Sequence, residues 1–482
     1  MKESVQCTAC GRRQTTRRVL IALTALLFAD WSLNAHVFPL YDTILPAMRE
    51  VCTLSSGALL LAGALTASRR PRMLDGRAIA ATAAGCACAG SVAVLLSAQN
   101  PHTVLMAVGA CVLSLSEGCC MMLVGMALVS LERKRMVPVV VSAQAASSLA
   151  SLVCPVGFSP LWFAMHGACL LLVSIAALPL AVPLIARLAR DMPPHDASLT
   201  QPASFLPFGH QVFVCLFLFR VVYGFMLTFG ENAGVPADSP ALLAASLITA
   251  VVYRIRPAWI TTDGIFIAAA LCALAGLLYT PLSSVVPPAI TVSLAGAGVG
   301  LFELFNWIVL AALARKNIHG SMTVFAWGCA LNSVGVVLGA NAGRFVNESW
   351  VDHRQLAAFA IMNIVLAGTA YAAVFLRGFS FERTISSLQE SAPLVTHLEA
   401  AGRGDPVLSL DDACAVVEQR FGLTKREGEV LGLLARGRSG VFVQNELCVS
   451  YNTVKSHVKH IYQKTGVHAH QELIDLVEAN RK

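Results

Sequence analysis

Long apolar runs recur along most of this chain, and they constrain its fold more than any other feature. Between Val19 and Leu376 the sequence returns repeatedly to stretches of about 20 residues with few charges, the length at which a helix spans the hydrocarbon of a bilayer. The chain of 482 residues is 56% hydrophobic and only 13% charged. Soluble globular proteins do not have this composition. We therefore expect an all-α, polytopic membrane bundle that fills most of the chain.

The apolar runs divide into twelve predicted spans. They cover residues 19–38, 53–68, 78–98, 103–131, 136–154, 161–186, 208–229, 239–253, 259–279, 286–314, 321–343 and 355–376. The first run has full membrane length, contains Asp30 and precedes further spans, so we expect it to stay as a helix and not to be cleaved. The longest polar break, from Ala186 to Pro207, separates two predicted six-helix halves, 19–186 and 208–376.

Basic residues test this count, because Lys and Arg concentrate in the cytoplasmic connections of membrane proteins. With twelve spans, the tail 1–18 and every even-to-odd connection are cytoplasmic. Those segments hold eighteen basic residues: Lys2, Arg12, Arg13, Arg17, Arg18, Arg69, Arg70, Arg72, Arg77, Arg133, Lys134, Arg135, Arg187, Arg190, Arg254, Arg256, Arg315 and Lys316. The opposite connections hold three, Arg49, Arg344 and Arg354. This bias predicts that both chain ends are cytoplasmic.

The cysteines and the remaining polar motifs indicate neither a metal site nor an enzyme. Most of the 15 cysteines lie inside the apolar runs, where a thiol acts as a small apolar side chain. Cys7 and Cys10 have the spacing of a zinc knuckle, but the tail offers no second pair of ligands. We predict no cofactor, no metal and no catalytic residues.

Four ionisable residues lie near mid-span and are the candidate functional groups of the bundle: Asp30, Glu117, Arg220 and Glu303. They could pair with one another and so stabilise the packing of the helices, they could shape a polar ligand pocket, or they could form a proton path. Because an isolated buried ion is costly, we expect Arg220 to contact at least one carboxylate, first of all Glu303 in the same half. An acid without a cation should be neutral or should await a polar or cationic ligand. Walls for a pocket could come from His166, Asn306, Trp307, Trp327 and Asn332.

A more polar stretch, residues 377–410, is the predicted linker, with one short helix before Gly402. As a flexible coil its 34 residues would average roughly 30–35 Å end to end, too loose to transmit a small helix movement. We therefore expect signalling by docking or release of the last domain, or by dimerisation. That domain, 411–482, should begin with a leader helix whose apolar face is Ala413, Val416, Val417 and Phe421.

Three further helices follow from capping signals. Thr424 and Glu427 form a predicted capping box, and Gly437 ends the helix that starts there. A second, short helix is expected over roughly 440–447. Ser450 should cap a third helix, from Tyr451 to about Thr465. Its buried stripe is Val454, Val458 and Ile461, at helical spacing.

The opposite face of this third helix carries Asn452, Lys455, Ser456, Lys459 and Gln463. A solvated helix face usually mixes both charges, whereas this one has no carboxylate. Acids are unfavourable beside phosphates, and long donors can reach base edges in the major groove of double-stranded DNA. The pattern therefore predicts a helix-turn-helix domain.

Residues 423–477 closely resemble the carboxyl-terminal domain of LuxR-type regulators, through the Leu-Thr-x-Arg-Glu-x-Glu-Val-Leu opening and the Thr-Val-Lys-x-His core. The resemblance implies a four-helix domain with Lys455, Ser456 and Lys459 facing bases, and Thr453 and His457 near phosphates. Asn452 completes the predicted DNA-binding set. The resemblance also implies a homodimer that forms through the fourth helix, about 469–479.

Two positions depart from the LuxR-type pattern. Val443 and Gln444 replace the usual Ile-Ala early in the second helix. Ala469 and His470 replace Ser-Arg before the fourth helix, which removes an expected phosphate contact. We expect the fold to survive both changes and the affinity for DNA to be lower than is typical.

The twelve-span membrane part resembles the major facilitator superfamily by topology, with two six-helix halves and both termini inside. In that fold the first, fourth, seventh and tenth spans line a central cavity, and these are the spans that carry the four charges. The Asp-Arg-Gly-Arg pattern of those transporters is reduced here to Asp75, Gly76 and Arg77. This departure from the pattern argues against transport.

Together these features predict a membrane-bound, one-component transcriptional regulator in the bacterial inner membrane. Its expected partners are double-stranded DNA, the lipid membrane, a small-molecule ligand and a second copy of itself. One alternative is a transporter that carries a regulatory DNA-binding domain. Another is a passive anchor that holds the DNA-binding domain at the membrane.

Overall fold

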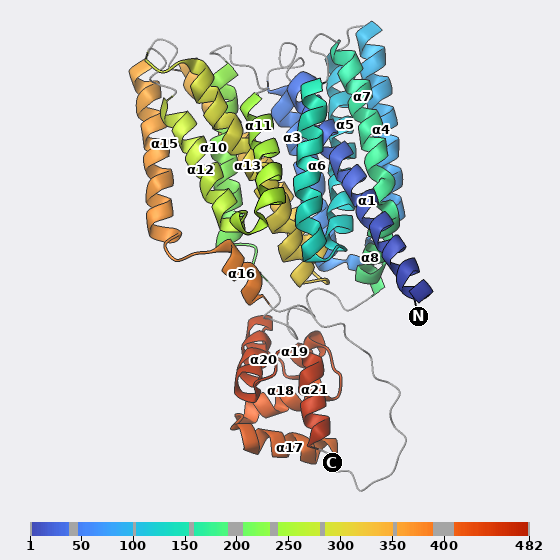
Figure 1. Ribbon diagram of the computed structural model, residues 1–482. Coiled ribbons are helices and arrows are strands. Elements are labelled where there is room, and N and C mark those ends of the chain that lie inside the picture. Colours follow the sequence, from blue (N-terminus) through green and yellow to red (C-terminus); the bar gives the residue numbers. More distant parts are fainter. Residues whose placement is uncertain are drawn as a thin grey trace.

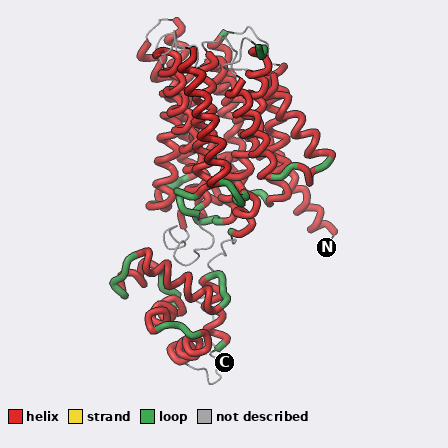
Figure 2. The backbone as a smooth tube through the Cα atoms, turned by 90° about the vertical axis from the view of Figure 1, so that its left-hand side faces the viewer, coloured by secondary structure: helices red, strands yellow, loops and turns green. Residues whose placement is uncertain are grey.

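Helices form the regular elements of this protein throughout the part of the chain that the structure describes (Figure 2). This computed structural model describes residues 2–37, 47–99, 103–153, 159–190, 206–231, 240–279, 285–349, 354–388 and 409–480. The expected all-α class is confirmed. The chain forms a membrane-type bundle and a small carboxyl-terminal helical domain (Figure 1).

The bundle has a helix, or a pair of helices, over each of the twelve predicted spans. The first half contains α1 (Lys2–Ser32), η1 (Leu33–Val37), α3 (Met48–Arg69), η2 (Pro71–Met73), α4 (Gly76–Gln99), α5 (Thr103–Val129), α6 (Arg133–Val153), α7 (Pro160–Ser174), η3 (Ile175–Ala177) and α8 (Leu178–Arg190). The second half contains α10 (Gln211–Glu231), α11 (Pro240–Ile255), η5 (Pro257–Trp259), α12 (Thr262–Tyr279), α13 (Pro288–Lys316), α14 (Ser321–Ser349) and α15 (Arg354–Phe375).

Among the described residues, eight segments are long and apolar enough to cross a membrane. They are Met48–Arg69, Gly76–Ser97, Val104–Val129, Leu161–Ala189, Gln211–Thr228, Thr262–Tyr279, Ala289–Lys316 and Ser321–Glu348, and shorter apolar helices lie at Ala244–Ile255 and Ala358–Ala372. The polytopic membrane character is thus present, while the number twelve stays a prediction. The sixth predicted span is interrupted at η3, because Pro179 has no N–H to donate to the carbonyl of Ile175.

Small residues allow the closest helix contact in the second half, between α10 and α14. A Cβ added at Gly339 would lie 2.0 Å from the carbonyl oxygen of Val221, and one added at Gly224 would lie 2.2 Å from that of Val336. Since these neighbours are backbone atoms, they cannot move aside as a side chain can. Glycine on both helices is therefore what lets the backbones touch.

The two halves meet through α3 against α14 and through α6 against α11. Two of the arginines that we assigned to external loops lie in these helices instead. Arg49 is in the first turn of α3 and only 4% exposed, and Arg344 is near the end of α14. That part of the loop assignment was wrong, because a hydropathy window excludes charged residues that pair inside a helical bundle.

After α15 the chain turns into a short helix, α16 (Phe381–Ser387), within the segment predicted as linker. Phe381, Ile385 and Leu388 are buried in the same apolar core as the membrane helices. The expectation of a short helix before Gly402 is met by α16. Residues 389–408 of the predicted linker lie outside the described residues.

The carboxyl-terminal domain has five helices: α17 (Leu410–Phe421), α18 (Lys425–Ala435), α19 (Gly440–Glu446), α20 (Tyr451–Thr465) and α21 (His470–Ala479). Its own apolar core includes Val417, Leu431, Val458 and Leu473. The leader helix α17 is present, but one of the residues that we assigned to its buried apolar face is exposed. Ala413, Cys414 and Val417 are buried, whereas Val416 is 40% exposed.

Candidate DNA-binding interface and buried charge clusters

The third helix of the carboxyl-terminal domain, α20, is oriented by its buried stripe and its cap. Val454, Val458 and Ile461 are fully buried. The Ser450 hydroxyl accepts a hydrogen bond from the Thr453 amide at 3.2 Å, and Gly466 ends the helix with a φ of 72°. Both the cap and the stop were predicted. They fix which face of α20 is turned outward.

That outward face carries the predicted DNA-contacting residues. Asn452, Ser456, Lys459 and Gln463 are exposed, and Lys455, Thr453 and His457 are half-buried. The Thr453 hydroxyl lies 2.8 Å from that of Ser450, so it is held at the start of the helix. The structure therefore groups these side chains on one face of α20, as their spacing indicated. What each contacts on DNA remains a prediction.

A buried carboxylate, Glu427, joins the start of α18 to the end of α20. The capping box is confirmed: the Glu427 amide donates to the Thr424 hydroxyl at 3.3 Å, and the Thr424 amide donates to the Glu427 carboxylate at 2.8 Å. Lys464 of α20 donates to the same carboxylate at 2.7 Å. Burial would raise the pKa of Glu427, but the hydrogen bonds from Lys464 and Thr424 outweigh it and hold that pKa at about 2.

His470 behaves differently from the residue that usually stands at its position. Its side chain is 1% exposed, and its Nε2 lies 2.8 Å from the carbonyl oxygen of Leu434. Burial lowers its pKa and favours the neutral ring. His470 thus links α21 to α18 inside the domain, and its side chain does not take the place of a surface phosphate contact.

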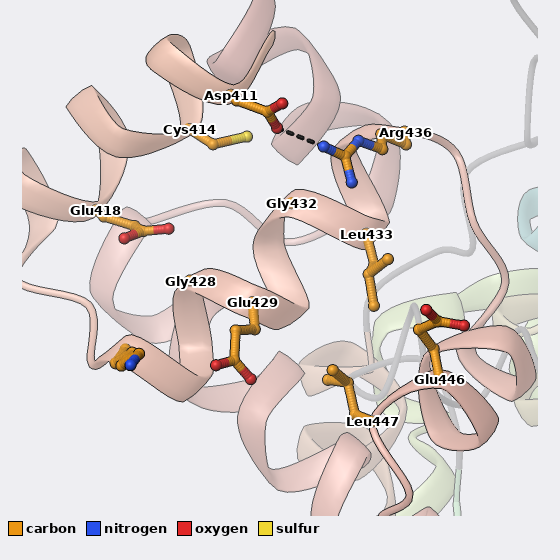
Figure 3. A pocket seen from close by; sticks show the side chains of 11 residues that line it. Asp411, Cys414, Glu418, Gly428, Glu429, Gly432, Leu433, Arg436, Glu446 and Leu447 are labelled. Atoms are coloured by element: carbon orange, nitrogen blue, oxygen red, sulfur yellow. Dashed lines mark hydrogen bonds and ion pairs between the residues drawn. The ribbon is translucent and has the colours of Figure 1, made fainter.

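The leader helix α17 lies across α18 and α21, beside a shallow pocket (Figure 3). Arg436 at the end of α18 donates to Asp411 at 2.5 Å, and the Glu418 carboxylate packs against Gly428. Arg420 donates to Asn480 at 3.4 Å, just after α21. These polar contacts attach α17 to the ends of α18 and α21.

Inside the bundle, the four predicted charges come from α1, α5, α10 and α13. Arg220 is 9% exposed and donates a hydrogen bond to the Glu303 carboxylate, the pair that we expected first. The guanidinium also lies over the rings of Phe302 and Tyr223, 5.1 and 5.6 Å from their centroids. Two of the four charges are therefore paired within the second half.

The other two charges, Asp30 and Glu117, lie near each other in the first half, where their carboxyl groups interact electrostatically. The amide of Asn34 donates to Asp30 at 2.7 Å. Asp30 also interacts electrostatically with Arg220 and Glu303, so the two pairs face each other across the boundary between the halves.

The five candidate wall residues make contacts between helices. Asn332 donates to Asn306 at 2.9 Å, and the Trp327 indole donates to the carbonyl of Phe208 at 3.3 Å. His166 stacks on Trp162 at 4.7 Å and lies 3.3 Å from the Ser32 hydroxyl. Trp307 is 4% exposed against Phe325.

Sequence reasoning missed a third buried cluster, formed by Arg49, Glu50 and Arg344. Glu50 is 3% exposed, and its two carboxylate oxygens accept from Arg49 at 3.2 Å and from Arg344 at 3.0 Å. The cluster joins α3 to α14 across the two halves. The adjacent charges Arg49 and Glu50 at the edge of an apolar run were the available signal.

Comparisons with known proteins identify the two parts separately. Residues 422–477 match the family model of bacterial regulatory proteins of the luxR family. They are a LuxR-type DNA-binding domain. Over 52 residues the chain is 46% identical to the HTH-type transcriptional regulator MalT of Yersinia pestis (strain Pestoides F) and 44% identical to that of Serratia proteamaculans (strain 568). These matches cover 11% of this chain and only 6% of the length of those relatives.

The bundle is similar to transporters of the major facilitator superfamily. The solved structure of the proton:xylose symporter XylE aligns with a TM-score of 0.51 and 13% sequence identity, over 78% of this chain and 100% of that one. The human organic anion transporter MFSD10 aligns over 74% of this chain, with a TM-score of 0.48 and 15% identity. At such identities the likeness to XylE concerns the fold alone. The protein thus joins a LuxR-type domain to a membrane domain of transporter-like fold.

Proposed function

We propose that this protein is a membrane-bound transcriptional regulator whose membrane domain senses a small molecule and whose LuxR-type domain binds DNA. The observation that carries the proposal is the outward face of α20, where Asn452, Lys455, Ser456 and Lys459 lie together without a carboxylate. Such a face suits a phosphate-flanked groove. In the proposed complex Lys455, Ser456 and Lys459 face bases, and Thr453 and His457 lie near phosphates.

In this proposal the protein acts as a homodimer on DNA. LuxR-type domains pair through their fourth helix, here α21, and a two-fold DNA site would match such a dimer. The protein would reside in the bacterial inner membrane with both ends in the cytoplasm, because the cytoplasmic connections of the twelve-span arrangement hold most of the basic residues.

The sensor role rests on two groups of ionisable side chains inside the bundle: the ion pair of Arg220 with Glu303, and the neighbouring carboxyls of Asp30 and Glu117. Ionisable groups inside a membrane bundle are costly to bury, which makes them candidates for a functional site. In this proposal a polar or cationic ligand binds to the Asp30 and Glu117 carboxyls, since the described contacts include no cation paired directly with either of them.

One experiment separates this proposal from its two rivals. Transcripts are compared between cells with the wild-type chain and with Asp30→Asn, Glu117→Gln or Arg220→Lys, across a panel of small molecules, while vesicles that contain the purified protein are tested for uptake of the same compounds. The proposal expects a compound-dependent transcript response that the substitutions alter, at unchanged protein levels. Uptake into vesicles supports the transporter, and a transcript response that ignores all three substitutions supports a passive anchor.

A further inference from the structure

The short helix α16 packs against the bundle through an apolar face. Phe381, Ile385 and Leu388 are 3%, 1% and 7% exposed, and their spacing places them on one side of the helix. The Phe381 ring lies 4.8 Å from those of Phe266 on α12 and Phe305 on α13. The chain is thus held against the second half immediately before it continues toward the DNA-binding domain (Figure 1).

The start of α16 is also fixed to the second half by Asp263. Its carboxylate accepts from the Ser380 hydroxyl at 2.5 Å and from the Phe381 amide at 2.6 Å. Ser380 in turn caps α16 by accepting from the Arg383 amide at 3.1 Å. Asp263, at the start of α12, is therefore part of this attachment.

Glu382 links α16 to both halves at once. One carboxylate oxygen accepts from Arg133, in the first turn of α6 in the first half. The other accepts at 2.8 Å from the Thr262 hydroxyl, at the start of α12 in the second half. Nearby, Arg315 at the end of α13 donates at 2.6 Å to the carbonyl of Leu131, so a second contact crosses the same boundary.

These two attachments differ in strength. The contacts to the second half are buried and include an aromatic cluster, whereas Arg133 and Glu382 are 45% and 43% exposed, and exposed ion pairs are weak. If the two halves move apart at this end of the bundle, the contact between Glu382 and Arg133 is therefore the first to break.

We propose that α16 couples the arrangement of the two halves to the DNA-binding domain: both halves hold it while Glu382 bridges Arg133 and Thr262, and it undocks more readily when the halves separate, because only the contacts to the second half then hold it. Undocking moves the point at which the chain leaves the bundle from Leu388 back to the end of α15, and so changes the access of the DNA-binding domain to DNA. This inference rests on the proposed function, because it names how a change in the membrane domain reaches transcription.

The test uses the full chain with charge variants of this bridge. Arg133→Glu and Glu382→Arg each place like charges together, and the double variant R133E/E382R restores an opposite pair. The matched control is Arg383→Glu, a charge reversal at an exposed position of the same helix. Docking is measured by the rate at which a maleimide reagent labels Ile385→Cys, whose position is buried, with Ser386→Cys as the exposed reference.

We expect each single variant to raise the labelling rate at position 385 at least tenfold and to change transcripts of the bound genes at least threefold. The double variant should reverse both effects, and Arg383→Glu should cause neither. An unchanged labelling rate in the single variants overturns the claim that the contact between Glu382 and Arg133 helps to hold α16 in place. A faster labelling rate with unchanged transcripts overturns only the claim that undocking of α16 changes transcription. If the wild-type chain occupies no DNA, the proposed function fails, and this inference fails with it.

Discussion

Arg220 on α10 and Glu303 on α13 form an ion pair inside the second half of the bundle, with side chains 10% and 25% exposed. Both the guanidinium and the carboxylate are removed from water, and each compensates the buried charge of the other. Asp30 lies within electrostatic range of both. Removing one member should therefore be worse for the fold than removing both.

The first prediction tests this pairing. Arg220→Met leaves the Glu303 carboxylate without its cation and should lower the free energy of unfolding by about 3–5 kcal/mol. The double variant R220M/E303M should be clearly more stable than Arg220→Met, as measured by chemical unfolding of the purified protein in detergent. A double variant as unstable as the sum of its single variants would show that the pair is not coupled.

The second prediction concerns the contact between α10 and α14. Gly339→Val places side-chain atoms against the carbonyl of Val221 and should destabilise the bundle by about 1–3 kcal/mol or more. The control is Gly85→Val on α4, because a Cβ there meets no atom within 4 Å among the described residues. The melting temperature of purified Gly339→Val should be lower than that of purified Gly85→Val. Equal melting temperatures would contradict the close backbone contact.

The third prediction concerns DNA recognition. Lys455→Ala or Lys459→Ala should weaken binding by about 1–3 kcal/mol and change the preferred sequence if the side chain contacts a base. The control is Lys425→Ala, which removes the same charge from the exposed start of α18, away from the outward face of α20. It should leave sequence preference unchanged in a binding selection with residues 409–482, which have their own core. Wild-type preference in both α20 variants would exclude this face as the reader of bases.

The fourth prediction follows from the lowered pKa of Glu427. Its pKa of about 2 lies below the ordinary value of 4.5, so the stability it contributes is present above pH 4.5 and is lost as the pH falls toward 2. By linkage this is on the order of 3 kcal/mol. Urea unfolding of residues 409–482 should show Glu427→Gln much less stable than wild type at pH 7. The difference should shrink steadily below pH 4.5, and a difference independent of pH would rule out the charged carboxylate as its cause.

Local signals predicted the carboxyl-terminal domain nearly residue by residue. The Thr424 capping box, the Ser450 cap and the Gly466 stop are each set by side chains within a few positions of one another, so the sequence alone contains them. Val416 was assigned to the wrong face because its environment depends on how α17 lies across α18 and α21. That packing is decided by residues far away in the chain.

Long-range pairings were harder to predict. Arg220 and Glu303 could be matched because two opposite charges in one half leave few choices. The contacts of Glu50 with Arg344, and of Glu382 with Arg133, join residues hundreds of positions apart. A hydropathy window assigns such charged residues to the ends of spans or to loops. Only the folded bundle shows that they join the two halves.

The central claim is that the membrane-embedded chain binds DNA through α20 and thereby changes transcription. It is tested most directly by chromatin immunoprecipitation of the tagged full-length protein, together with transcript measurement, for the wild type and the double variant K455A/K459A. The account predicts discrete occupied sites next to genes whose transcripts depend on the protein. The double variant should lose both the occupancy and the transcript changes while reaching the membrane in equal amounts. Absence of specific occupancy by the wild type, or unchanged occupancy and transcripts in the double variant, would contradict it.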